Sequence, residues 1–274
     1  MNHTVPNYFS PLPFAPITSG DFSVTLAQCP EEVMEAQALR YDVFVHEMKA
    51  DVSQEAHEAK RDFDTYDALC DHLLVRYHQQ GHAPRIIGTY RMLRDTELPE
   101  GTGFYSEDEY NISKLKASGR NLLEVGRSCT HPDFRNKVAM QLLWRGIGEY
   151  VMYYNIDYLF GCASFPSADP QDHNHGLSYL YHHHLADETI CPRTVEKHFV
   201  DMNLIPANQI DEKRTFFTLP ILVKGYLRLG GKVGNGAFID HDFNTTDILM
   251  IVDTATVSNK HTSKYAPDSV RGGH

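Results

Sequence analysis

Residues 123–130, LEVGRSCT, constrain the fold of this chain most, because an apolar, β-prone run carries an acid and a base around a glycine. In an unbroken strand, Glu124 and Arg127 would point to opposite faces of the sheet. One extra residue at Gly126, a β-bulge, would bring both side chains onto the same face. We therefore expect a strand that is shaped to present a site. The alternative, an ordinary structural ion pair on a sheet, stays open at this point.

The segments around this strand predict the order of the other elements. A turn, HPDFR, then an amphipathic segment and another apolar run follow it, which is the order of a β-α-β unit. Strands before that unit indicate a mixed sheet, so the expected fold class is α/β (α+β mixed sheet). In order, we expect a strand at 22–28, a helix at 30–47, a long loop at 49–65, a hairpin of strands 72–77 and 85–93, the strand 123–130, a helix at 135–155, a strand at 157–163, helices at 177–185 and 220–229, and a strand at 248–252.

Length and composition fit one large domain. The chain has 274 residues, of which 42% are hydrophobic, and this is enough for a sizeable core. Residues 1–20 hold four prolines without periodicity, and the sequence from 258 on is polar and glycine-containing. We expect a flexible N-terminal segment (1–20), a single domain (21–257) and a flexible C-terminal tail (258–274).

The charge balance and the cysteines narrow the class of protein. A net charge of −11 argues against general nucleic-acid binding, which needs a basic surface. The five cysteines are scattered and have no CxxC spacing, which is typical of reduced core thiols. The N-terminus lacks the features of a signal peptide, and no apolar run is long enough to span a membrane. We expect a cytoplasmic protein in which Cys129 is a buried thiol rather than a nucleophile.

Several common chemistries lack their usual motifs. The chain has no G-x-S-x-G elbow, no P-loop and no G-x-G-x-x-G run, which argues against serine hydrolases, P-loop nucleotidases and dinucleotide-binding enzymes. The 16 histidines include the run 182–184. Consecutive histidines on a helix point about 100° apart and do not converge on one ion. We therefore expect no metal site.

An acid-rich segment, residues 61–71, points to a cationic substrate. It holds Asp62, Asp64, Asp67 and Asp71, and it comes just before the predicted hairpin. Carboxylates near a buried base suit an amino substrate, because its ammonium group must be held and then deprotonated before it can attack. A solvated acidic loop that caps a helix is the alternative.

The order of these residues resembles that of the acyl-homoserine-lactone synthases, which are relatives of the GNAT acyltransferases. The shared pattern lies within residues 22–163. It consists of Arg40-x-x-Val43-Phe44, Asp64-x-x-Asp67, Gly88-x-x-Arg91-Met92-Leu93 and Glu124-x-x-Arg127. The resemblance implies a GNAT-like acyl-CoA N-acyltransferase fold with helices on both faces of the sheet.

Longer strings resemble the bacterial L-ornithine N-alpha-acyltransferases, the enzymes that start ornithine-lipid synthesis. They are EVGRSCTHPDFR from 124, DYLFGCASF from 157, LSYLYHHH from 177, KGYLRLG from 224 and IDHDFNTTD from 239. The resemblance implies transfer of a 3-hydroxylated fatty acyl group from acyl carrier protein to the α-amine of L-ornithine, which gives lyso-ornithine lipid. An acyl-homoserine-lactone-type synthase that uses S-adenosylmethionine and a non-catalytic acyl-binding protein stay open as alternatives.

One departure from the usual GNAT pattern bears on the acyl donor. Typical GNAT enzymes have Q/R-x-x-G-x-G/A after this strand, where backbone N–H groups at a helix start bind the coenzyme A pyrophosphate. This chain has RNKVAM from Arg135, with Val138 and Met140 in place of the glycines. An acyl carrier protein presents its thioester on phosphopantetheine without that pyrophosphate. We therefore expect acyl carrier protein as the donor and no bound cofactor.

The resemblance also implies roles for the residues of the pattern. As a hypothesis, Glu124 would be the general base on the ornithine ammonium, directly or through a water, and Arg127 would orient Glu124 or another carboxylate. Backbone N–H groups at the bulge would stabilise the oxyanion. Asp64 and Asp67 would hold the cationic groups of ornithine. The further substrate-binding candidates are Arg40, Phe44, Arg91 and Ser128.

An acidic chain that binds an acidic carrier protein needs a local basic surface. The candidates are Arg135, Lys137 and Arg145 near the start of the predicted helix 135–155, and the i, i+4 pair Lys224 and Arg228 further on. Each of them could equally be a solvated surface charge. The lipid product leaves open a peripheral contact with the inner membrane.

Overall fold

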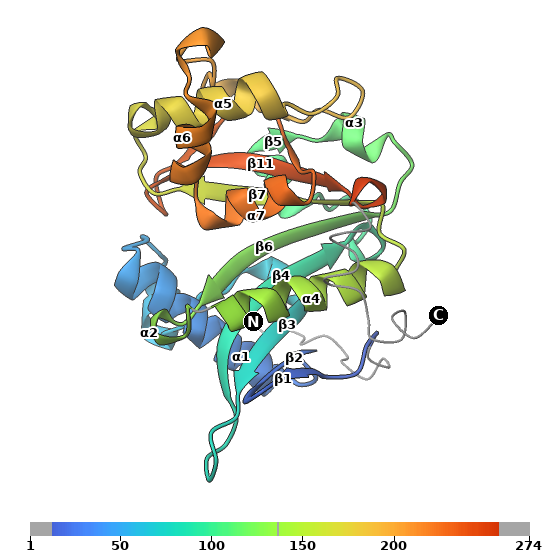
Figure 1. Cartoon of the computed structure of the whole chain (residues 1–274). Coiled ribbons are helices and arrows are strands. Elements are labelled where there is room, and N and C mark those ends of the chain that lie inside the picture. The colour runs from blue at the N-terminus through green and yellow to red at the C-terminus, as the bar shows by residue number, and fades with distance from the viewer. Residues whose placement is uncertain (1–12, 136, 258–274) are drawn as a thin grey trace, which may run out of the picture. The chain divides into compact units, whose positions relative to one another are not determined.

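The computed structural model of the chain describes residues 13–135 and 137–257, and these residues form two compact units. Unit 1 contains the described residues up to Glu100 together with 125–156, and unit 2 contains 101–124 and 157–257. Figure 1 labels their elements along the chain. The expectation of a single domain over 21–257 stays a prediction. The expected flexible termini fall largely on residues 1–12 and 258–274, which lie outside the described residues.

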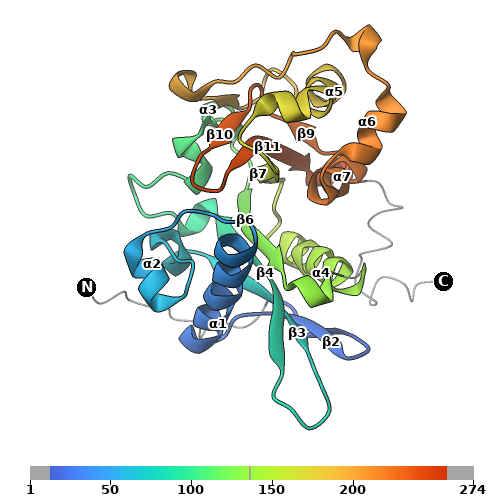
Figure 2. The same ribbon diagram turned by 90° about the vertical axis from the view of Figure 1, so that its left-hand side faces the viewer.

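Unit 1 is a sheet with a helix on each face. Strands β1 to β4 pair antiparallel in sequence order, and β6 follows β4. Helix α4 packs against β2 and β3, whereas α1 packs against β4 from the opposite side, as Figure 2 shows. The elements are β1 (Ile17–Ser19), β2 (Phe22–Leu26), α1 (Pro30–Tyr41), α2 (Gln54–Ala59), β3 (Asp71–Tyr77), β4 (Arg85–Arg94), β6 (Leu122–Thr130, shared with unit 2) and α4 (Lys137–Tyr153).

Helix α1 begins where the sequence predicts. Pro30 occupies its first position, and Glu31 and Glu32 lie in its first turn, next to the positive end of the helix dipole. A π-helical segment, Asp42–Glu47, continues it, so the predicted helix at 30–47 is confirmed. The hairpin of β3 and β4 and the helix α4 are confirmed as well.

Two expectations for unit 1 were wrong. The stretch 49–65, expected to be a loop, contains α2, and the Ser53 side chain caps this helix by accepting the Ala56 N–H. A short exposed helix has the same polar composition as a loop, so composition alone did not separate them. Within residues 13–20, for which no order was expected, β1 pairs with β2.

Unit 2 is a mixed sheet with helices. The start of β6 runs parallel to β7, which runs antiparallel to β11. A parallel pair is the outcome that the β-α-β order predicts. Strands β10 and β9 both pair with β11. The elements are β5 (Tyr110–Asn111), α3 (Ser113–Lys116), β7 (Tyr158–Phe165), α5 (Asn174–His184), β8 (Arg193–Thr194), α6 (Glu212–Thr218), α7 (Ile221–Arg228), β9 (Lys232–Val233), β10 (Phe238–Asp240) and β11 (Thr245–Asp253).

One face of the unit 2 sheet carries polar residues. Register pairs Glu124 with Phe160 and Cys162 with Leu249, and alternate residues of a strand share a face. Glu124, Cys162 and Asp247 therefore lie on the same face. The segment 104–112 covers it, because the Phe104 ring lies edge-on to Phe160 with 5.0 Å between centroids. In the described part of the chain, no helix combines the length and apolar character needed to cross a bilayer.

Candidate active site

Arg40 is the buried centre of an ion-pair cluster in unit 1. Its guanidinium donates to Asp62 Oδ2 at 2.7 Å, to Asp67 Oδ1 at 2.9 Å and to Asp67 Oδ2 at 2.9 Å. It also donates to the backbone carbonyl of Asp62 at 2.6 Å. All three side chains are buried. Arg40 thereby ties helix α1 to the segment between α2 and β3, and its expected role in substrate binding stays a prediction.

Asp67 belongs to the same cluster. Besides Arg40, its carboxylate accepts from Gln37 Nε2 at 3.1 Å and from Arg91 Nη1 at 3.3 Å. Burial alone would raise the pKa of Asp67, but Arg40 and Arg91 hold it well below its usual range. Asp67 is thus held by side chains of unit 1, and its expected contact with the ornithine ammonium stays a prediction.

His72 closes this cluster from β3. Its Nε2 lies 3.0 Å from the backbone carbonyl of Asp67, and the ring is buried. Burial lowers the pKa of His72 to about 4, so the ring is neutral at physiological pH. A neutral imidazole that donates to a carbonyl fixes the turn on which Asp67 lies.

Asp64 is the more accessible acid of the pair, with 24% of its side chain exposed. It precedes the 3-10 helix Thr65–Ala68 and caps it by accepting the Tyr66 N–H at 2.9 Å. Arg91 Nη1 lies 2.6 Å from Asp64 Oδ1, and Arg127 Nη2 lies 3.4 Å from Oδ2. Burial acts to raise the pKa of Asp64, but Arg91 and Arg127 lower it overall. Asp64 is therefore a charged carboxylate that reaches solvent.

Arg127 carries the irregularity of β6. Its φ is +50°, a left-handed value that is unusual for a side-chain-bearing residue in a strand, whereas Gly126 does not have a positive φ. The backbone irregularity of β6 thus lies at Arg127, and the expected bulge at Gly126 stays a prediction. Arg127 pairs with Asp64 and Asp62. Arg127 was expected to orient either Glu124 or another carboxylate. Its ion pairs with Asp64 and Asp62 in unit 1 support the second role.

Glu124 lies in the unit 2 part of β6 and is buried. Its carboxylate oxygens accept the backbone N–H groups of Tyr105 at 2.9 Å and Ser106 at 2.8 Å. These N–H groups open the 3-10 helix Tyr105–Asp108, so Glu124 holds the start of that helix. Two backbone donors suit a charged carboxylate, because a hydrogen bond to the charged form favours it.

Glu109 is a candidate that the sequence did not single out. It ends the same 3-10 helix, it is buried, and the Cys162 thiol donates to its Oε2 at 3.1 Å. Burial raises the pKa of Glu109 to about 8, and the nearby charge of Asp247 adds to the shift. A carboxyl group that titrates near neutral pH can both hold and release a proton. No motif marks it, because Glu109 is one of several acids in the run SEDEY.

The other expected substrate contacts are less specific. Phe44 lies buried in the π-helical segment after α1, and Ser128 is half-buried in β6. Their roles stay predictions. Cys129 is buried, and burial raises the pKa of its thiol to about 12, which disfavours the thiolate needed by a nucleophile. Among the described residues, no group of three or more His, Cys, Asp or Glu side chains is placed to hold a metal ion.

The basic residues expected to bind a carrier protein differ in their surroundings. Arg135 forms a two-armed ion pair with Glu47 at 2.5 Å, which neutralises part of its charge. The side chain of Lys137 lies outside the described part of the structure, and Arg145 is half-buried in α4. In unit 2, Lys224 Nζ donates to the Phe217 carbonyl at 3.0 Å, and the Arg228 guanidinium lies 6.0 Å from the Phe216 ring centroid.

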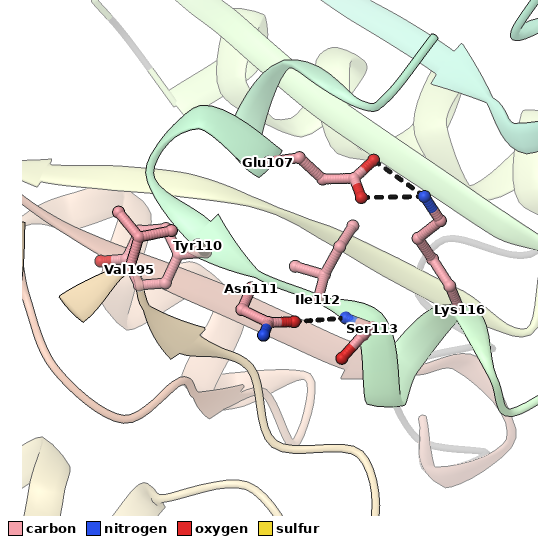
Figure 3. Close-up of a pocket in the computed structure, with 7 residues that line it drawn as sticks. All are labelled: Glu107, Tyr110, Asn111, Ile112, Ser113, Lys116 and Val195. Atoms are coloured by element: carbon pink, nitrogen blue, oxygen red, sulfur yellow. Dashed lines mark hydrogen bonds and ion pairs between the residues drawn. The ribbon is translucent and has the colours of Figure 1, made fainter. Parts of the chain in front are cut away.

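A shallow pocket of about 470 Å³ lies in unit 2 (Figure 3). Lys116 Nζ is ion-paired there with both carboxylate oxygens of Glu107, at 2.8 and 3.1 Å. Asn111 uses its side-chain oxygen to accept the Ser113 N–H. The lining contains none of the site residues predicted from the sequence: it consists of Glu107, Tyr110, Asn111, Ile112, Ser113, Lys116 and Val195.

Comparisons with known proteins identify the family. The family model "Acetyltransferase (GNAT) domain" matches residues 39–145. The chain is 42% identical over 251 residues to L-ornithine N(alpha)-acyltransferase of Rhizobium meliloti, covering 90% of this chain and 84% of that protein. It is 40% identical over 246 residues to L-ornithine N(alpha)-acyltransferase of Rhodobacter capsulatus, covering 89% and 94%.

Among solved structures, FeeM, an N-acyl amino acid synthase from uncultured soil microbes, matches with a TM-score of 0.49 and 10% identity, covering 91% of this chain and 99% of that chain. A similarity of this size carries no argument of its own. The GNAT match and the mixed sheet flanked by helices agree with the expected fold class. With both relatives covered over more than four fifths of their length, the chain is a GNAT-type acyltransferase that belongs to the L-ornithine N(alpha)-acyltransferase family.

Proposed function

We propose that this protein transfers a fatty acyl group, 3-hydroxylated as in the expected product, from acyl carrier protein to the α-amine of L-ornithine. The observation that carries the proposal is the identity of about 40% to proteins with that acceptor in their names, over nine tenths of the chain. The product is lyso-ornithine lipid. The protein works in the cytoplasm, and the apolar product favours a peripheral contact with the inner membrane.

Glu124 is the proposed general base. The ornithine ammonium must lose a proton before its nitrogen can attack the thioester carbonyl. The two backbone N–H groups from Tyr105 and Ser106 fix the carboxylate in one orientation. The amine then adds to the carbonyl carbon, the phosphopantetheine thiolate leaves with the electron pair of the C–S bond, and the remaining excess proton on the nitrogen passes to that thiolate as the amide forms. Backbone N–H groups at the irregular part of β6 near Arg127 stabilise the oxyanion in this proposal.

Asp64 is the proposed contact for a cationic group of ornithine. Support comes from its exposed fraction and from its ionised state, which Arg91 and Arg127 maintain. Those two arginines also hold the carboxylate in place. Asp67 and Arg40 support this turn from behind, as their shared buried ion pair indicates. Arg91 is thus a positioning residue in the proposal.

Acyl carrier protein is the proposed donor. The first turn of α4 and the residues just before it carry RNKVAM, in which Val138 and Met140 stand where glycines would let a pyrophosphate approach the backbone. A phosphopantetheine arm on a carrier protein has no such pyrophosphate. Arg135 and Lys137 at this turn, together with Arg145, are the proposed docking residues. Lys224 and Arg228 are a second proposed set.

The test of the proposal is the substitution Glu124→Gln. We expect the variant to fold and to lose about 10²–10⁴-fold in kcat, because an amide cannot accept the ammonium proton. Glu55→Gln on the exposed face of α2 is the matched control and keeps full activity. The measurement is mass spectrometry of lipids from cells that express each variant, with purified-enzyme rates beside it.

The outcomes separate the competing functions. A Glu124→Gln enzyme with more than half of the wild-type rate removes Glu124 from the mechanism. A wild-type protein that acylates the amine of S-adenosylmethionine instead of ornithine is an autoinducer synthase. If no amine causes the release of free thiol from acyl carrier protein, the protein binds acyl groups without transferring them.

A further inference from the structure

The corner between α6 and α7 exposes two large apolar side chains close together in the sequence. Phe217 is 68% exposed and Ile221 is 70% exposed, and they exceed the other exposed large hydrophobic residues of the described chain. Between them, Leu219 is buried and anchors the corner to unit 2. Figure 2 shows α6 and α7 joined by this short turn. Side chains exposed to this extent protrude from the surface instead of lining a groove.

The two helices that meet at this corner carry more basic than acidic residues. Lys213 and Arg214 are exposed on α6, and Arg228 is exposed on α7. Lys224 Nζ donates to the backbone carbonyl of Phe217 at 3.0 Å. Residues 211–232 contain five basic and two acidic residues, whereas the whole chain has 25 basic and 36 acidic ones. The local sign of charge is therefore opposite to that of the molecule.

We propose that the α6–α7 corner is a membrane-contact surface, which inserts Phe217 and Ile221 into the headgroup region of an anionic bilayer. Apolar side chains that protrude among basic ones gain from both burial in the interface and attraction to anionic lipid. Acyl carrier protein, for which Lys224 and Arg228 are the second proposed docking set, would satisfy these basic residues, but it would have to supply a pocket for each protruding side chain, so here we assign the corner to the bilayer. A bilayer accommodates them without a preformed partner. The surface itself is argued without the proposed function. Only its purpose, release of the lipid product into the membrane, rests on that function.

Vesicle binding tests the surface without requiring activity. The purified full chain is floated with vesicles of phosphatidylglycerol and phosphatidylcholine, or of phosphatidylcholine alone. We expect binding to the anionic vesicles that weakens as salt rises. The double variant Phe217→Ser/Ile221→Ser should bind roughly tenfold more weakly or worse, since both inserted side chains are gone. The matched control is Met152→Ser/Tyr153→Ser, which removes two half-exposed apolar residues of α4 and keeps wild-type binding.

A charge variant completes the design. Lys213→Glu/Arg214→Glu should abolish the preference for anionic vesicles. All variants are checked by thermal melting and by the rate of acyl transfer in solution without vesicles, which we expect to stay near wild type. Wild-type protein that does not float, or corner variants that float like the α4 control, would overturn the proposal. Loss of carrier-protein binding by the charge variant, without vesicle binding by the wild type, would assign the corner to a protein partner instead.

Discussion

Asp64 and Asp67 lie three residues apart around one 3-10 turn, yet their carboxylates have different surroundings. Asp67 is enclosed by Arg40 and Arg91, whereas Asp64 reaches solvent. Removing one partner of a buried ion pair leaves an uncompensated charge. The sequence motif treats the two acids alike, and only their partners distinguish them.

Asp67→Asn and Asp64→Asn should therefore differ in kind. We expect Asp67→Asn to lower the free energy of unfolding by about 3–5 kcal/mol, because Arg40 loses a buried counter-charge. Asp64→Asn should keep most of that stability and raise the KM for ornithine more than the KM for the acyl donor. Urea unfolding and steady-state kinetics on both variants measure this difference. An Asp67→Asn enzyme that unfolds like the wild type but needs more ornithine would place Asp67 in the substrate site.

The loss of stability at acid pH follows from Asp67. Its pKa is lowered in the folded state, so its contribution to the free energy of unfolding is present above the ordinary pKa of an aspartate and is lost as pH falls below it.

Glu109 behaves in the opposite way. Its pKa in the folded state, about 8, lies above the ordinary 4.5. Its contribution to the free energy of unfolding is therefore complete below about pH 4.5 and is lost as pH rises towards 8.

Glu109→Gln should remove that alkaline loss. We expect the variant to gain stability relative to the wild type between pH 5 and 8, by on the order of 1–4 kcal/mol at the upper end. Below about pH 4.5 the two proteins should unfold alike, since both side chains are then neutral. The measurement is the midpoint of chemical denaturation at several pH values, with Glu107→Gln as a control. Parallel pH curves for wild type and variant would show that Glu109 is not the titrating group.

At the scale of elements, two glycines make different demands on the backbone. A Cβ on Gly146 of α4 would lie 2.8 Å from Leu73 Cδ1 and 3.1 Å from Val24 Cγ2. Both neighbours are fully buried in strands of unit 1. On Gly126 of β6, a Cβ would meet nothing within 4 Å. Gly146 is required by close packing of α4 on the sheet, whereas Gly126 has no steric reason in the folded chain.

Gly146→Val and Gly126→Ala form a matched pair of tests. Gly146→Val should cost about 1–3 kcal/mol or more, because the added carbons overpack the interface between α4 and the sheet. Gly126→Ala should unfold within about 0.5 kcal/mol of the wild type. Thermal melts of both variants measure the difference. A strong loss of turnover in the stable Gly126→Ala protein would indicate that a substrate passes over β6 at this point.

The elements with strong periodicity could be predicted from the sequence, and those fixed by partners could not. The segments of α1, α4 and the β3–β4 hairpin carry caps, helical spacing and turn residues in their own sequence. Helix α6 was not predicted, and α2 was taken for a loop, because short polar segments lack such periodicity. The positive φ of Arg127 could not be predicted either, since glycine is the residue expected there.

The candidate site shows the same division. The sequence placed Arg40, Asp67 and Arg91 in one pattern, and the structure joins them in one cluster. Which acid pairs with which arginine depends on contacts between residues 22 to 27 positions apart, which spacing does not encode. Glu109 was missed because its unusual environment comes from burial beside Asp247, far along the chain.

For the whole molecule, the net charge and the local charge act in opposite directions on an acidic carrier protein. The net charge of −11 repels such a partner, and screening by salt would relieve that repulsion. Basic residues at the turn before α4 attract it, and screening would weaken that attraction. The ion pair of Arg135 with Glu47 reduces the local attraction. The sign of the salt effect therefore reports which charge governs the encounter.

We expect kcat/KM for acyl carrier protein to fall as salt rises, because a docking surface acts at shorter range than the net charge. Arg135→Glu/Lys137→Glu should lower kcat/KM about tenfold at low salt and flatten its salt dependence. The control Lys60→Glu/Arg85→Glu changes the net charge by the same amount at exposed positions elsewhere. If both double variants lose the same activity, net charge governs the encounter. A wild-type rate that ignores salt, together with preferred use of acyl-coenzyme A, would return the chain to coenzyme A-dependent transfer and overturn the proposed donor.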